Sequence, residues 1–143
     1  MKFTTFELEL ESKIPKKIKV SIRTEVYMVS KNGSPLKINP LTTRDFKPSD
    51  ALIFDRKFSE SILLSYSDLV SGNHSVKVIE YDLPENILRI AELFEVEDFI
   101  LGEKRYLVNV YSVEEKGVTK EDTMVFKKKT DALRLIRSIH IGE

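Results

Sequence analysis

The sequence predicts an α+β fold, with a curved, mainly antiparallel sheet of about five to seven strands and two to four helices packed on one face, including a C-terminal helix. Two observations support this fold class. Apolar and polar residues alternate in several segments, and alternation at period two is typical of strands with one buried face. Near the C-terminus the apolar residues recur at helical spacing instead. With 143 residues, the chain fits a single domain over residues 1–143.

The first two strands are predicted over Thr5–Glu11 and Lys17–Ser30, with Pro15 between them. Both segments alternate without a break, so each sends apolar side chains to one face and polar side chains to the other. The polar face of the second strand carries cations and Tyr27, and we expect that face to lie in water. A strand of this length exceeds the usual one, so we expect it to bend or to contain a bulge.

A hairpin turn is predicted at Asn32-Gly33, because both residues accept positive φ and alternating segments flank them. Leu36 and Ile38 should pair back briefly onto the long strand. The prolines that follow remove hydrogen-bond donors from the chain. We therefore predict that Asn39–Lys47 is a loop on an exposed edge.

The middle of the chain is harder to assign. Ala51–Phe58 and Ile62–Val70 fit helix and strand patterns about equally, and we favour helices, the second running from about Glu60 to Ser71. Ser75–Tyr81 alternates and is predicted to be a strand. From Pro84 the apolar residues recur at helical spacing, which predicts a helix with Glu92 on its exposed side.

Three elements are predicted in the last third of the chain. Tyr106–Val113 is apolar, aromatic and β-branched on both faces, so it should be a central strand covered on each side. A turn at Gly117 leads to a strand over Thr123–Lys128. Thr130-Asp131 then begins a terminal helix whose apolar stripe packs on the sheet.

Composition excludes several kinds of chemistry. The chain has no cysteine, so it contains no disulfide, no thiolate nucleophile and no thiolate metal site. No apolar run is long enough for a membrane-spanning helix or a signal peptide, and we expect a cytoplasmic protein. The chain also lacks Gln and Trp and is 32% charged, which fits a thermophilic archaeon or its virus as well as a mesophile with an AT-rich genome.

The charges are divided along a chain of net charge +0. Ser12–Lys57 is basic, and Phe58–Asp122 is acidic. Two interpretations follow. If these segments fold onto different faces, one face suits phosphate; if they meet, they neutralise each other in surface ion pairs that each contribute roughly 0–1 kcal/mol.

The long basic strand is the first candidate site. Cations spaced along a groove bind phosphates, and a flat aromatic ring stacks on a base, so this face predicts binding of single-stranded DNA or RNA. A second cluster of lysines precedes the terminal helix. The predicted nucleic-acid-binding residues are Lys16, Lys17, Lys19, Arg23, Tyr27, Lys127, Lys128 and Lys129.

Two alternatives stay open. An exposed sheet edge with apolar residues nearby predicts a protein–protein contact, such as a homodimer. Asp98 together with Glu114-Glu115-Lys116 resembles the ligand spacing of metal-dependent nucleases, although Gly117 places these residues in a turn. His74 and His140 have no ligand spacing. We therefore predict a non-catalytic binding protein without a cofactor or a metal.

Overall fold

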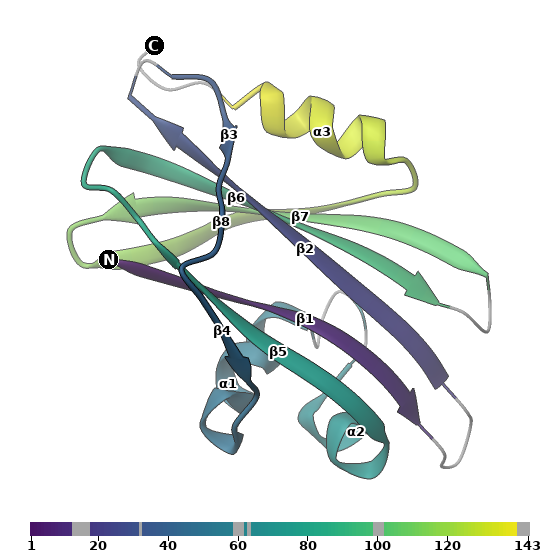
Figure 1. Cartoon of the computed structure of the whole chain (residues 1–143). Coiled ribbons are helices and arrows are strands. Elements are labelled where there is room, and N and C mark those ends of the chain that lie inside the picture. The colour runs from purple at the N-terminus through teal and green to yellow at the C-terminus, as the bar shows by residue number, and fades with distance from the viewer. Residues whose placement is uncertain (13–17, 32, 59–61, 63, 99–101, 140–143) are drawn as a thin grey trace.

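The computed structural model describes residues 1–12, 18–31, 33–58, 62, 64–98 and 102–139. Antiparallel strands form one open sheet in the order β4-β5-β1-β2-β6-β7-β8, and the short β3 pairs with β2 (Figure 1). The predicted class of a mainly antiparallel sheet with helices, including a C-terminal one, is confirmed in these coarse terms. Within the described part of the chain, no helix is both long and apolar enough to cross a membrane.

The first hairpin joins β1 (Lys2–Ser12) to β2 (Ile18–Ser30), as predicted. The two strands pair only from Leu8↔Ile22 to Ser12↔Ile18, and β2 then continues along β6. Where they part, Glu7 accepts a hydrogen bond from the backbone N–H of Thr24 at 3.0 Å. The expected irregularity in the long strand is a register shift between Val29 and Ser30.

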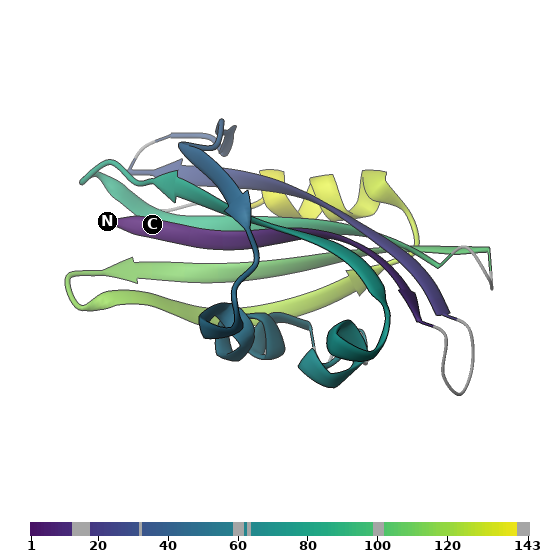
Figure 2. The same cartoon turned by 60° about the horizontal axis from the view of Figure 1, so that its bottom comes forward.

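Helices α1 (Ala51–Phe58) and α2 (Tyr66–Ser71) cover one face of the sheet, which we call the inner face (Figure 2). A 3₁₀ turn, η1 (Pro48–Asp50), leads directly into α1. Rings of α1 meet rings of the sheet, with Phe54 5.6 Å from Phe6 and Phe58 4.8 Å from Phe94 between centroids. The phenylalanines of α1 therefore belong to the core, and they are not available for association with a partner.

Helix α3 (Lys129–Arg137) lies on the opposite, outer face (Figure 2). Its buried Ala132 and Ile136 pack on Leu93 and Val108 of the sheet. The C-terminal helix was predicted, but packing of all helices on one face was not correct, because the central strands are apolar on both faces and need a cover on each.

The predicted helix after Pro84 is wrong, because Ile87–Asp98 is strand β6, in the interior of the sheet between β2 and β7. Its apolar residues contact the inner core through Phe94 and the α3 side through Leu93. A strand that is buried on both faces has no period-two alternation, so its pattern resembled a helix. The change of assignment moves Glu92 from an exposed helix face to the inner core, where its side chain is 0% exposed.

The remaining strands follow the predictions more closely. β5 (Asn73–Asp82) pairs with β1, and β7 (Glu103–Glu114) lies between β6 and β8 (Gly117–Phe126). Gly117 has φ +143°, a conformation that residues with a side chain rarely adopt, and it makes the tight turn between β7 and β8 possible. The segment predicted as a loop contains an edge strand, β4 (Thr42–Asp45), and β3 (Leu36–Lys37) pairs back on β2 as expected.

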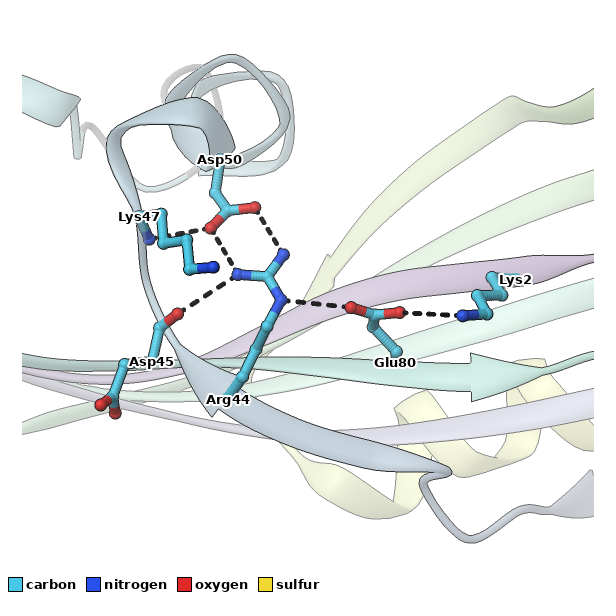
Figure 3. Close-up of polar contacts among 6 residues, drawn as sticks. All are labelled: Lys2, Arg44, Asp45, Lys47, Asp50 and Glu80. Carbon is cyan, nitrogen blue, oxygen red and sulfur yellow. Dashed lines mark hydrogen bonds and ion pairs between the residues drawn. The ribbon is translucent and has the colours of Figure 1, made fainter.

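An ion-pair network fixes the start of α1 to the sheet edge (Figure 3). Arg44 of β4 holds Asp50 with two parallel hydrogen bonds of 2.8 Å, and its Nε lies 3.2 Å from Glu80 of β5. Asp50 also accepts a hydrogen bond from the backbone N–H of Lys47 at 2.8 Å. Glu80 lies 3.8 Å from Lys2 of β1, so the network spans three strands and the turn before α1.

We predict that Asp50→Asn lowers the free energy of unfolding by about 1.5–3 kcal/mol at neutral pH, since the buried Asp50 loses its charge-assisted hydrogen bonds with the partly exposed Arg44. The Arg44 guanidinium holds the pKa of Asp50 below its ordinary value. This stabilisation is therefore complete above the unfolded-state pKa of about 3.9, and it disappears as the pH falls through the lower folded-state pKa. Urea unfolding of both proteins from pH 7 to pH 3 measures the difference, and a difference that stays constant contradicts the assignment.

Candidate functional site

The outer face of β2 carries the predicted basic site, but carboxylates flank it on both sides. Arg23 lies 3.8 Å from Glu9 of β1, and its cross-strand partner on β6 is Glu95. Lys19 is exposed and pairs across the ladder with Glu11. Lys16 and Lys17 lie outside the described residues. The basic strand thus lies between carboxylates of β1 and, through Glu95, a carboxylate of the acidic segment.

Tyr27 lies at the other end of the same face, partly covered by the α3 core. Its hydroxyl donates to Glu25 at 2.8 Å, and Lys129 lies 2.9 Å from the same carboxylate. Burial raises the pKa of Glu25, but the hydrogen bonds from Lys129 and Tyr27 outweigh burial, so the pKa lies below its ordinary value. The structure therefore brings two predicted site residues together around an ionised carboxylate, which competes with a phosphate for them.

The other predicted residues are dispersed. Lys127 and Lys128 are exposed before α3. Asp98 and Glu114 lie at opposite ends of the β6–β7 pair, roughly 35 Å apart at about 3.3 Å per residue, so the nuclease-like arrangement is not formed. Among the residues that the structure describes, no three His, Cys, Asp or Glu side chains come together as a metal site.

A buried polar cluster on the inner face was not predicted. Glu92 Oε1 accepts hydrogen bonds from Tyr111 at 2.7 Å and from Asn109 at 3.1 Å. Its second oxygen lies 2.5 Å from Lys57 Nζ, which α1 brings down onto the sheet. Asn109 in turn accepts a hydrogen bond from the Thr123 hydroxyl at 2.7 Å. Both oxygens of the buried carboxylate are satisfied, as burial of a charge requires.

Burial also changes the proton affinity of this cluster. The pKa of Lys57 is lowered by burial, which outweighs the opposing effect of Glu92, and the nearby charge of Lys120 lowers it further. Burial and the negative charge of Glu92 raise the pKa of Tyr111. Tyr111 thus stays protonated and donates to Glu92, while Lys57 loses its proton more readily than a lysine in water does.

A cavity of about 370 Å³ opens beside this cluster, between the start of β1, helix α1 and the β7–β8 turn. Phe3, Lys57 and Tyr111, all buried, form its floor. Exposed residues form its rim, with Arg56 from α1 and Lys120 from β8 among them. Tyr111 and Lys120 are direct cross-strand partners, so the rim cation of β8 stands beside the floor.

The lining of the cavity has one sign of charge. It contains Lys2, Arg56, Lys57 and Lys120, and of the described residues that line it, none is Asp or Glu. Lys57 is matched by Glu92 and Lys2 lies near Glu80. Arg56 and Lys120 form no ion pair with any residue that the structure describes. The described lining of the cavity therefore carries two cations that no carboxylate pairs, whereas the cations described on the outer face of β2 lie beside carboxylates.

Sequence reasoning missed this site because its residues are distant in the chain. Lys2, the Arg56-Lys57 pair and Lys120 lie on three separate segments, and only the folding of β1 beside the β7–β8 turn brings them together. The sequence did contain one indication of this site. Glu92 stands two residues from Ile90 and two from Phe94. Read as a strand, this spacing places a carboxylate on an apolar face, where it needs a buried cation.

We predict that Lys57→Met lowers the free energy of unfolding by about 3–5 kcal/mol, because Glu92 is left buried without its cation. The double variant Lys57→Met/Glu92→Met should recover part of this loss, since neither charge remains. Urea unfolding of the single and double variants gives the coupling energy. Losses that simply add would mean that the two side chains do not act as a pair.

Comparison of the chain with known protein families, with curated proteins and with solved structures finds no match.

Proposed function

We propose that this protein binds a small organic anion in the cavity between β1, α1 and the β7–β8 turn. The observation that carries the proposal is the lining, which has four cationic side chains and, among its described residues, no carboxylate. A concave site lined by one sign of charge concentrates ligands of the opposite charge. A volume of about 370 Å³ lies within the range of small-molecule sites.

The two unmatched cations suit an oxyanion in different ways. Arg56 offers a planar fork of donors that matches carboxylate or phosphate oxygens, whereas Lys120 offers a compact charge. Both are rim residues, so they reach the ligand without first being desolvated. Because each lacks an ion pair within the described chain, an incoming anion has no internal carboxylate to displace.

Apolar side chains provide the rest of the wall. Phe3 lies at the floor, and Ile53 of α1 and Val118 of β8 also line the cavity. Ile53 is 37% exposed, so a bound molecule removes apolar surface from water. The proposed ligand therefore has an apolar body and one anionic group.

Binding of single-stranded nucleic acid by the outer face of β2 stays a prediction from the sequence, as do homodimerisation, a thermophilic source and a cytoplasmic location. We favour the cavity over the strand face for a physical reason. A phosphate that approaches Arg23 or Lys129 meets the carboxylates of Glu9 and Glu25, which are already paired with these cations.

Isothermal titration with phenyl phosphate tests the proposal, with phenol as the neutral analogue that shares its aromatic ring but has no phosphate. We expect phenyl phosphate to bind and phenol to bind far more weakly. The double variant Arg56→Gln/Lys120→Gln should lose roughly tenfold in affinity or more, equivalent to about 1.4 kcal/mol, because both anion contacts are removed.

Lys127→Gln is the matched control, since it removes one exposed cation outside the cavity and should leave the affinity unchanged. Equal affinity for phenol and phenyl phosphate, or unchanged binding by the double variant, would reject the cavity as an anion site. A drop in affinity with rising salt is expected for wild type, because the rim contacts are exposed and screened.

A further inference from the structure

The floor of the cavity brings an amine, a carboxylate and a phenol together. Lys57 Nζ lies 4.4 Å from the centre of the Phe3 ring and 5.2 Å from that of Tyr111, and both rings line the cavity. Glu92 lies 2.5 Å from this nitrogen, and the Tyr111 hydroxyl lies 3.4 Å from it. A proton acceptor and a proton donor therefore stand next to one buried primary amine.

We propose that Lys57 forms an imine with an aldehyde or ketone that carries the anionic group, so that the cavity takes a phosphorylated or carboxylated carbonyl compound. This inference rests on the proposed anion binding. Arg56 and Lys120 hold the anionic group at the rim, and the carbonyl carbon extends to Lys57 at the floor. Holding the carbonyl carbon beside the amine in this way makes the reaction effectively unimolecular and therefore faster.

At each step, Glu92 or Tyr111 accepts or donates the proton that is transferred. Glu92 takes one proton from the Lys57 ammonium, and the free amine attacks the carbonyl carbon to form a C–N bond. The carbonyl oxygen takes the Tyr111 proton, and the nitrogen returns a proton to the phenolate, which gives a carbinolamine. The carbinolamine hydroxyl then takes the proton from Glu92 and leaves as water, while the nitrogen lone pair forms the C=N bond.

The product is well matched to its surroundings. A protonated imine keeps the positive charge of the original ammonium, so Glu92 still has a cation beside it when water has left. The environment also favours the reactive form of the amine, because burial and the nearby Lys120 lower the pKa of Lys57. A desolvated lysine beside a second cation is a common way to activate an amine toward carbonyls.

A purely structural role for the same residues makes a different prediction. If Lys57 only fixes α1 to the sheet, its loss destabilises the protein, but its amine does not react in preference to exposed lysines. Reactivity of the wild-type chain separates these roles without any variant that could fail to fold.

Pyridoxal 5′-phosphate is a suitable probe, because it combines an aldehyde, an apolar ring and a phosphate. The wild-type protein is mixed with less than one equivalent of the probe, reduced with borohydride and mapped by peptide mass spectrometry. We expect the pyridoxyl group mainly on Lys57. The label should decrease at least about tenfold in Arg56→Gln/Lys120→Gln, in line with the lost affinity. Labels spread over exposed lysines such as Lys116 and Lys127, with Lys57 unmodified, overturn the inference.

Two controls separate this inference from the proposed function. Lys57→Arg keeps a cation beside Glu92 but has no primary amine, so it should bind pyridoxine 5′-phosphate, which lacks the aldehyde, and take no label at position 57. If the wild-type protein binds pyridoxine 5′-phosphate and Lys57 stays unlabelled by the aldehyde, imine formation is rejected and anion binding stands. If the wild-type protein binds neither compound, both proposals are rejected.

Discussion

The buried contact between Glu92 and Lys57 is the constraint on which the rest of this molecule depends. A carboxylate at the centre of a sheet is costly unless a cation and hydrogen-bond donors surround it. The sheet provides Tyr111 and Asn109, but the cation comes from α1, so the helix must lie where Lys57 reaches Glu92. The phenylalanine contacts of α1 and the Arg44 network at its start support the same position. Helix α1, which supplies the cation that Glu92 requires, thereby also forms one wall of the cavity.

The pairing of the strands determines which charged side chains lie next to one another in this fold. On the outer face of β2, antiparallel pairing sets Arg23 opposite Glu95 and Lys19 opposite Glu11. At the cavity, the residues that come together are Lys2, Arg56, Lys57 and Lys120, with one buried carboxylate beneath them. A chain with net charge +0 can therefore carry a strand face on which the described charges are paired and a cavity lined by cations. The distribution of charge along the sequence did not indicate which surface would have paired charges and which would be cationic.

Most parts of the fold that could be predicted have one wet face, and β7 is the exception, because its β-branched and aromatic residues predicted a strand although both of its faces are covered. β1, β2 and the Leu36–Ile38 return show clear alternation, and α3 shows a clear helical stripe, so their patterns have one physical interpretation. β6 could not be assigned because the inner core covers one of its faces and α3 the other. β4 could not be predicted because its pairing depends on β5, a distant partner. The candidate site was missed for the same reasons, since it needs both the burial of Glu92 on β6 and the approach of α1.

The most direct test of the cavity as an anion site is backbone amide NMR during titration with phenyl phosphate. If the anion binds in the cavity, the largest chemical-shift changes fall on the residues that line it, in particular Ile53, Arg56, Val118 and Lys120. Changes centred instead on Lys19, Arg23 and Tyr27 would place anion binding on the outer face of β2 and contradict binding in the cavity. The absence of any change at concentrations that saturate a weak site would contradict it as well.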